Sequence, residues 1–201
     1  PLQIVTFYNA IANNGKMMKP YVVESIEHEG RVTREFKPQI LNGSICSKAT
    51  ADTLTRALKM VTLEGTASRL KNAKCTVAGK TGTSRVHLDK EEQAGSGNPY
   101  ADIHGRKKHQ ATFVGFFPAD QPKYTAIVVV YTGLMSNNVY GGKIPALTFK
   151  DIVDGIWAYD STWGNEIKEN GSIPQMKEEP ISTAKGEDIP VPDLTGLGLK
   201  D

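Results

Sequence analysis

Cysteine is scarce in this sequence, since only Cys46 and Cys75 occur among 201 residues. A disulfide-rich scaffold needs a higher density of cysteines, and a structural zinc site needs them in closely spaced pairs. The sequence therefore excludes both. We expect the two cysteines to be small buried or half-buried thiols, and they do not indicate a compartment.

Charge of one sign and long apolar runs are also missing. The 24 basic and 22 acidic residues leave a formal net charge of +2, which produces no strong field toward nucleic acid, and we expect no nucleic-acid partner. The longest apolar run, residues 126–130, is far shorter than the ~20 residues that cross a membrane. The chain is expected to be soluble and globular. It opens at Pro1 without a methionine, which indicates a piece of a larger protein.

One glycine that a phosphate-binding loop requires is missing from VAGKTGTSRV, residues 77–86. The pattern G-x-x-x-x-G-K-[ST] needs a glycine five positions before Gly79, where this sequence has Lys74. The residues after Thr81 favour a strand, whereas a P-loop continues directly into a helix. The sequence therefore argues against nucleotide binding.

What the sequence does contain is a clear series of periodic segments. Apolar spacing predicts amphipathic helices over residues 1–14, over 47–65 with Ser47 at the start, and from about 145 to 157. Alternation on either side of Glu29-Gly30 predicts a β-hairpin over 19–36 with a charged, solvent-facing tip. Strands are predicted near residues 75–86, 110–118 and 123–133. We expect the last of these, a continuous β-branched run, to be central with both faces covered. The order indicates an α+β fold in which helices cover an antiparallel sheet.

Two segments lack such periodicity. Residues 87–109 form a polar connection between two predicted strands, far longer than an ordinary hairpin loop, and such loops tend to be functional or mobile. Residues 161–188 are charged and contain prolines, which predicts a linker. Apolar residues return at 189–201, but the chain stops before a core could close.

Lys80 is followed by small and hydroxyl-bearing residues on the first of the predicted strands. Because strand side chains alternate, Lys80, Gly82 and Ser84 share one face, and Thr81 and Thr83 share the other. At an exposed edge, an extended peptide can pair with the backbone while the ammonium and hydroxyl groups bind a carboxylate. A solvated lysine beside an ordinary strand glycine is the alternative that the spacing leaves open.

Five segments carry a resemblance to a known family. In chain order they are PLQIVTFYNAIANNGKMMKPYVV, VTLEGTASRL, VAGKTGT, ATFVGFFPADQPKY and YGGKIPALTFKDI. In them the sequence resembles the C-terminal half of the transpeptidase domain of class B penicillin-binding proteins, most strongly the cell-division type. The tail VPDLTGLGLKD resembles the opening of a PASTA domain. The resemblance implies a transpeptidase part at 1–160, a linker at 161–188 and a truncated PASTA-like start at 189–201.

The resemblance implies a serine D,D-transpeptidase that cross-links peptidoglycan stem peptides at their D-Ala-D-Ala ends, is acylated by β-lactams and uses no cofactor or metal. Of the family signatures S-x-x-K, S-x-N and K-T-G, only the last is matched convincingly, at Lys80, Thr81 and Gly82. By family role, Lys80 directs positive potential toward the substrate carboxylate and the serine–lysine proton network. Thr81, Thr83 and Ser84 bind substrate, and the Thr83 N–H is an oxyanion-hole donor, worth about 3 kcal/mol of barrier.

Other matches to the first two signatures lie in the wrong places. Residues 68–71 (SRLK) directly precede the K-T-G strand, whereas the family's nucleophile lies far upstream. Residues 182–185 (STAK) fall in the linker, where nothing could bury the lysine and lower its pKa. Residues 96–98 and 136–138 fit S-x-N but follow K-T-G, in the wrong order. We infer that the half bearing the nucleophile is absent and that this chain alone is inactive.

The remaining polar candidates favour ordinary roles. The histidines have no metal-ligand spacing, and we expect solvated loop or turn positions for them: His28, His87, His104 and His109. The basic run 106–108 could touch an anionic polymer but is expected to be a solvated cluster. A mobile loop rarely fixes two carboxylates at the separation that glycoside cleavage needs, which argues against Asp89, Glu91 and Glu92 as such a pair.

Three further residues or pairs have structural interpretations. Trp157 and Trp163 are predicted to serve packing and the linker. Gly141-Gly142 matches the family's glycine pair before the last helix, and a role as a turn is sufficient to explain it.

Two alternatives remain for the parent protein. A β-lactamase or D,D-carboxypeptidase of the same fold would pass the acyl group to water, although the PASTA-like tail argues against it. A non-catalytic binding or scaffold module would lack an upstream S-x-x-K. For the favoured transpeptidase, the resemblance implies a parent anchored in the cytoplasmic membrane with this part extracytoplasmic or periplasmic. Its partners would include the missing N-terminal half of the same protein and division proteins.

Overall fold

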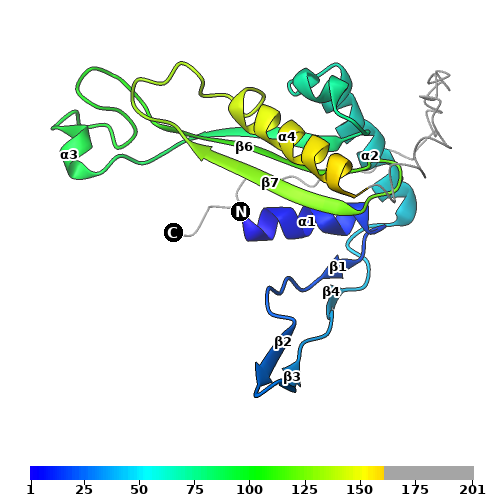
Figure 1. Cartoon of the computed structure of the whole chain (residues 1–201). Coiled ribbons are helices and arrows are strands. Elements are labelled where there is room, and N and C mark those ends of the chain that lie inside the picture. Colours follow the sequence, from blue (N-terminus) through cyan, green and yellow to red (C-terminus); the bar gives the residue numbers. More distant parts are fainter. Residues whose placement is uncertain (161–201) are drawn as a thin grey trace, which may run out of the picture.

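The computed structural model describes residues 1–160, which form a sheet with helices on both faces (Figure 1). The sheet is antiparallel, with the strand order β5-β6-β7, and its members are β5 (Ala78–Arg85), β6 (His109–Phe117) and β7 (Tyr124–Tyr131). The predicted α+β class and the three predicted strands are confirmed. The predicted linker and PASTA-like start, with Trp163, lie outside the described residues.

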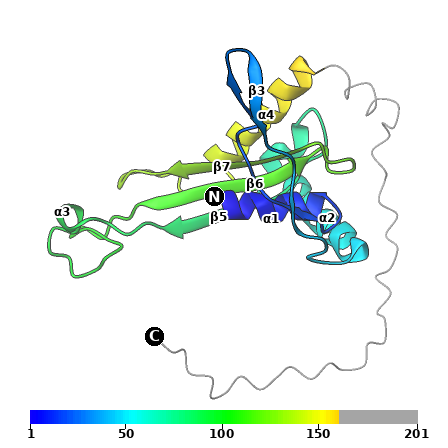
Figure 2. The same cartoon turned by 90° about the horizontal axis from the view of Figure 1, so that it is seen from below.

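Helices cover the sheet from opposite sides. α4 (Ile144–Tyr159) packs on one face and α1 (Leu2–Ala12) on the other, as Figures 1 and 2 show from two directions. α2 (Lys48–Leu63) lies beside the start of β5, where the Thr62 hydroxyl donates a hydrogen bond to the Val77 carbonyl at 2.6 Å. All three helices occupy the segments that apolar spacing predicts.

β7 lies in a different place from the one that its sequence predicts. Among residues 1–160, β6 is the central strand, because it pairs with β5 on one side and β7 on the other, so β7 is an edge strand of this three-stranded sheet and not the predicted central one. A continuous apolar run indicates that both faces of a strand are covered, and α1 and α4 do contact β7. Such an apolar run carries no information about how many strands lie beside it in the sheet. Within residues 1–160, the outer edge of β7 pairs with no strand.

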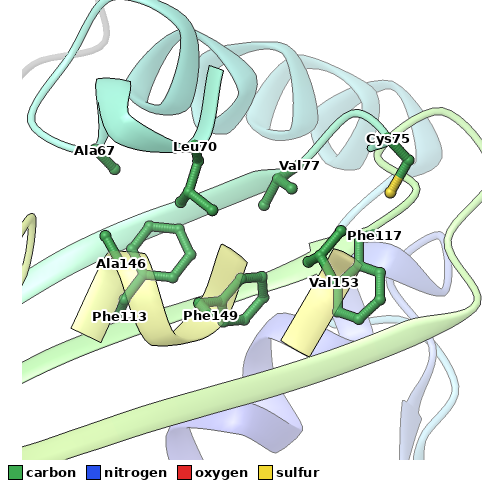
Figure 3. Packing of buried hydrophobic residues seen from close by; sticks show 9 residues of the cluster. All are labelled: Ala67, Leu70, Cys75, Val77, Phe113, Phe117, Ala146, Phe149 and Val153. Carbon is green, nitrogen blue, oxygen red and sulfur yellow. The ribbon is translucent and has the colours of Figure 1, made fainter. Parts of the chain in front are cut away.

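An aromatic core joins α4 to the sheet (Figure 3). The Phe149 ring packs edge-on against Phe113, with centroids 4.8 Å apart, and against Phe117 at 5.6 Å. The buried members of this cluster are Ala67, Leu70, Cys75, Val77, Phe113, Phe117, Ala146, Phe149 and Val153, and Trp157 packs against it as predicted. Burial raises the pKa of the Cys75 thiol to about 12, so this cysteine stays protonated and unreactive.

A two-part arm projects away from the sheet (Figure 1). Its base pairs β1 (Met17–Met18) with β4 (Ile40–Asn42), and its tip is the predicted hairpin of β2 (Ser25–His28) and β3 (Arg31–Glu35). The two turn residues both have positive φ, 51° at Glu29 and 73° at Gly30, as in the two-residue turns that match the twist of a hairpin. The hairpin prediction is therefore confirmed, including its turn.

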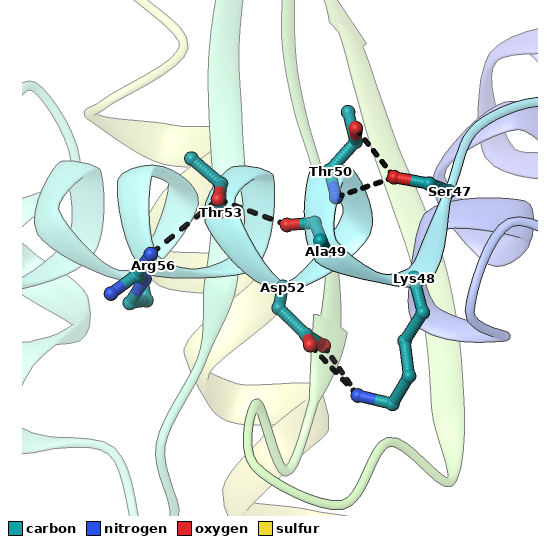
Figure 4. A network of polar contacts seen from close by, with 7 residues as sticks. All are labelled: Ser47, Lys48, Ala49, Thr50, Asp52, Thr53 and Arg56. Atoms are coloured by element: carbon teal, nitrogen blue, oxygen red, sulfur yellow. Dashed lines mark hydrogen bonds and ion pairs between the residues drawn. The ribbon is translucent and has the colours of Figure 1, made fainter. Parts of the chain in front are cut away.

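The N-terminus of α2 is fixed by a side-chain cap (Figure 4). Ser47 is extended, and its Oγ accepts a hydrogen bond of 3.1 Å from the Thr50 N–H. An exposed ion pair joins Lys48 and Asp52 in the same turn, with Nζ and Oδ2 2.7 Å apart. Such exposed pairs contribute only a few tenths of a kcal/mol, at about 0.3–0.5, so the cap is the stronger stabilising feature.

Removing this cap should have a measurable effect on stability. We expect Ser47→Ala to lower the free energy of unfolding by about 1 kcal/mol, because the Thr50 N–H loses its acceptor. Urea denaturation followed by circular dichroism measures the change. Lys48→Ala removes the ion pair but keeps the cap, and we expect it to cost less than about 0.5 kcal/mol. A larger loss for Lys48→Ala than for Ser47→Ala would contradict this ranking.

The long connection between β5 and β6 has a small interior of its own. Leu88 is fully buried, and the connection contains the short helix α3 (Lys90–Gln93). The buried carboxylate of Asp102 accepts hydrogen bonds from the His104 and Arg106 N–H groups and from Arg106 Nε at 2.6 Å. Local pairing therefore gives the polar segment a defined path.

Several charged groups of this connection differ from their predicted solvated state. Lys108 pairs with Glu92, and Arg106 pairs with Asp102, so the run 106–108 is not simply a solvated cluster. Asp89 caps α3 by accepting from the Glu92 N–H at 2.8 Å. His109 is half-buried at the start of β6, and its Nδ1 is buried without a hydrogen-bond partner among residues 1–160. His28, His87 and His104 are exposed as predicted. The spacing of these residues along the sequence did not reveal the ion pairs of Arg106 and Lys108.

Acid should weaken the same connection. Burial raises the pKa of Asp102, but the hydrogen bonds from Arg106 and His104 and the Arg106 charge outweigh burial and lower it below its ordinary value. A lowered pKa means that the ionised carboxylate stabilises the fold. This contribution is complete above the ordinary value, near pH 4, and is lost as the pH falls through the lowered pKa.

The melting temperature of Asp102→Asn relative to the unsubstituted chain measures this effect. We expect a constant deficit from about pH 7 to pH 5 that shrinks as the pH is lowered from about 4 to 2. A deficit that stays unchanged down to pH 2 would show that the charge of this carboxylate contributes nothing.

Candidate active site on the edge strand

The K-T-G segment lies in the middle of β5, an edge strand of the sheet. Lys80 and Thr83 are exposed, and Thr81 and Gly82 between them are half-buried. In the register with β6, Thr81 stands opposite Phe113. The segment is thus neither part of a loop-to-helix turn nor enclosed in the core, and its backbone edge on the side away from β6 belongs to no other strand among residues 1–160.

The packing on either side of the sheet separates the two sets of β5 side chains. Ala78 packs with Ile11 and Phe116 on the α1 side, and alternation places Lys80 and Gly82 on that face. Thr81 belongs to the α4 side, because its partner Phe113 packs against α4. The division of faces that the sequence predicts is confirmed.

Lys80 and two threonine hydroxyls form a connected polar group. Lys80 Nζ donates to the Thr81 carbonyl at 3.1 Å and lies 3.4 Å from Thr81 Oγ1. Thr81 Oγ1 lies 2.8 Å from Thr66 Oγ1, which belongs to the segment just after α2. Lys80 has no carboxylate within ion-pair distance in the described part of the chain, in contrast to Lys59, which pairs with Asp120. The charge of Lys80 is therefore available to an anionic ligand.

The Gly141-Gly142 pair packs directly on this group. The Gly141 N–H donates to Thr83 Oγ1 at 3.2 Å. A Cβ on Gly141 would lie 2.1 Å from the Thr112 carbonyl oxygen, and one on Gly142 would lie 2.0 Å from the Thr66 carbonyl oxygen. Both positions therefore require glycine for close approach. The predicted turn is confirmed, since the Lys143 N–H donates to the Tyr140 carbonyl at 3.0 Å, but a turn alone does not explain the pair.

Sequence reasoning missed two participants in this arrangement, Thr66 and the Gly141 N–H. Both lie in segments that carry the family resemblance, but neither segment contains a signature of its own chemistry. Thr66 is 15 positions before Thr81, and Gly141 is 58 positions after Thr83. Only the fold brings them to one place.

The chance matches to the other signatures lie apart from this group. Ser68 and Lys71 are both exposed, in the 3₁₀ helix η1 (Ser68–Asn72), so nothing desolvates the lysine. Ser96 Oγ donates to the carbonyls of Asn98 and Ala101 within its own loop. Ser136 Oγ accepts from the Asn138 N–H, which is again a local turn contact. The fourth match, 182–185, is outside the described residues.

Comparison with known proteins decides the family. Residues 1–154 match the family described as penicillin binding protein transpeptidase domain. The chain belongs to this family. Among its curated relatives, penicillin-binding protein H of Bacillus subtilis is 31% identical over 136 residues, covering 65% of this chain and 18% of the relative. Stage V sporulation protein D of the same organism is 26% identical over 204 residues, covering all of this chain and 28% of the relative.

A solved structure confirms the transpeptidase fold. A ceftriaxone acyl-enzyme complex of penicillin-binding protein A from M. tuberculosis matches with a TM-score of 0.57 at 23% identity, over 79% of this chain and 32% of that one. The chain therefore spans less than a third of the length of each of these three proteins. In its described part, no helix combines the length and the apolar character that crossing a membrane requires.

Proposed function

We propose that β5 forms one wall of the acyl-transfer cleft of a peptidoglycan D,D-transpeptidase that β-lactams acylate. One observation carries the proposal: on an open strand edge, Lys80 has no carboxylate partner among residues 1–160 and lies beside the Thr81 hydroxyl. An extended stem peptide can pair with this edge through its backbone. Its terminal carboxylate, or that of a β-lactam, then lies within reach of the ammonium and hydroxyl groups.

Each residue of the segment has a distinct part in this proposal. Lys80 attracts the carboxylate and keeps a positive potential over the nucleophile. Thr81 and Thr83 supply hydroxyl donors, with Ser84 beside them on the strand. Gly82 leaves its place on the strand free of a side chain, and a Cβ there would lie 2.5 Å from Thr112 Oγ1 of β6, so the packing within the sheet requires glycine. The Thr83 N–H is one donor of the oxyanion hole.

The nucleophile of the proposed reaction is a serine outside this chain. A serine–lysine pair works when a desolvated lysine takes the serine proton, and Ser68 and Lys71 are both exposed to water. We therefore assign the S-x-x-K serine to a part of a longer protein that precedes these residues. That protein would act outside the cytoplasmic membrane, where its substrate is, with an anchor of its own.

A fluorescent penicillin tests this proposal. We expect no covalent label on the 201-residue chain, and a label that survives denaturation on the longer protein with its upstream S-x-x-K segment. Prior incubation with unlabelled penicillin should abolish the label. A labelled band at the mass of the isolated chain would overturn the assignment of the nucleophile, and an unlabelled longer protein would overturn the transpeptidase function.

The lifetime of the adduct separates the transpeptidase from a hydrolase of the same fold. In a transpeptidase the acyl-enzyme formed by a β-lactam should persist for hours, because the cleft does not deliver water to it. Label lost within seconds would instead show a β-lactamase or carboxypeptidase.

A further inference from the structure

Among residues 1–160, Thr66 is the one residue outside β5 whose hydroxyl contacts the hydroxyl of the K-T-G threonine, Thr81. It follows Gly65 at the end of the α2 segment and precedes Ala67, which is fully buried in the aromatic core. Its carbonyl oxygen abuts Gly142 so closely that a Cβ there would stand 2.0 Å away. The Thr66 backbone is thus held between the core and the glycine pair, while its side chain is exposed.

The hydrogen-bonding capacities of the three groups restrict their pattern. A lysine ammonium only donates, so Thr81 Oγ1 acts as an acceptor toward Lys80 Nζ, 3.4 Å away. A hydroxyl has one hydrogen and two lone pairs. If Thr66 donates to Thr81 Oγ1 across 2.8 Å, both lone pairs of that oxygen are occupied. The single Thr81 hydrogen must then point to a further acceptor.

We propose that Thr66 is a positioning residue that turns the Thr81 hydroxyl hydrogen toward the carboxylate of the bound acyl donor. This inference rests on the proposed transpeptidase function. A carboxylate is a stronger acceptor than the Thr66 hydroxyl, because hydrogen bonds to ionised groups are about twice as strong as neutral ones. The bound arrangement is therefore a relay of donors from Thr66 to Thr81 and from Thr81 to the carboxylate.

Thr66→Val tests this relay in the longer protein, because valine keeps the shape of threonine and removes the hydroxyl. The measurement is the second-order rate of acylation by two thioester acyl donors that differ only in one group, a free carboxylate or its amide. We expect Thr66→Val to slow acylation by the carboxylate donor about tenfold, and by the amide donor less than about twofold. If Thr66 had a merely structural role, Thr66→Val would slow acylation by both donors equally.

Two further variants complete the experiment. Thr66→Ser restores the hydroxyl, and we expect a carboxylate-donor rate within about twofold of the unsubstituted protein. Thr53→Val is the matched control, because Thr53 is an exposed threonine of α2 whose hydroxyl, in the described part of the chain, forms hydrogen bonds only with Ala49 and Arg56 of the same helix. It should leave both rates unchanged.

The outcomes separate this inference from the function on which it rests. If the unsubstituted protein is acylated and Thr66→Val is acylated equally fast by the carboxylate donor, the positioning role is wrong and the transpeptidase proposal stands. Equal slowing with both donors also overturns the positioning role. If the unsubstituted protein is not acylated at all, both proposals fall.

Discussion

Lys80→Ala is expected to slow acylation of the longer protein by a penicillin about 100- to 1,000-fold, which corresponds to about 3–4 kcal/mol. The ammonium has no carboxylate partner in residues 1–160, so its loss leaves no intramolecular charge unpaired and removes only what it does for a ligand. The β-lactam carboxylate would lose its charged partner. Stopped-flow acylation with a chromogenic β-lactam measures the rate.

Two variants show whether the effect belongs to this position. Lys37→Ala removes a lysine from the exposed arm, where it pairs with Glu35 at 3.5 Å, and should leave the rate within about twofold. Lys80→Arg keeps the charge in a larger planar group and should recover only part of the rate. A rate for Lys80→Ala equal to that of Lys37→Ala would remove Lys80 from the proposed cleft.

Gly141→Ala is expected to slow acylation through a steric clash with the backbone of the proposed cleft. Its Cβ would lie 2.1 Å from the Thr112 carbonyl oxygen and 2.7 Å from that of Gly82, so the backbone must move. We expect the free energy of unfolding to fall by about 1–3 kcal/mol, as for other overpacked sites. Acylation should slow about 100-fold, because displacement of a catalytic group by about 1 Å has effects of that size.

Gly155→Ala is the matched control for this substitution. Gly155 lies within α4, and a Cβ there would meet nothing within 4 Å. Alanine should stabilise the helix by about 0.5–1 kcal/mol and leave acylation unchanged. If Gly141→Ala behaves like Gly155→Ala in thermal unfolding and acylation, the close packing on β5 has no functional importance.

The sequence predicted the elements of this fold well because each has a local signal. The Glu29-Gly30 turn, the Ser47 cap and the apolar periods of α1, α2 and α4 are all set by residues that are neighbours along the chain. The position of β7 in the sheet is not set by such neighbours, because the number of strands beside it depends on contacts between segments that are distant in the sequence. The ion pair between Lys108 and Glu92, which are 16 positions apart in the sequence, was missed for the same reason.

The candidate site was likewise predicted only where its features depend on neighbouring residues in the sequence. A strand with alternating faces at residues 80–84 follows from the local pattern, and its exposure was predicted correctly. The hydrogen bond between Thr66 and Thr81 and the packing of the glycine pair depend on how α2 and α4 meet the sheet. No spacing rule along the chain connects these segments. The catalytic roles of residues 80–83 remain predictions for the experiments above.

The register that sets Thr81 opposite Phe113 has a consequence for how the protein could evolve. Because the Phe113 ring packs against Phe149 of α4, the position of the Thr81 hydroxyl depends on aromatic contacts on the same face of the sheet. For the proposed cleft, we therefore expect substitutions of these buried aromatic residues to change the rate of acylation by a β-lactam without contacting it. Resistance could therefore arise in the interior of the domain, at the expense of thermal tolerance.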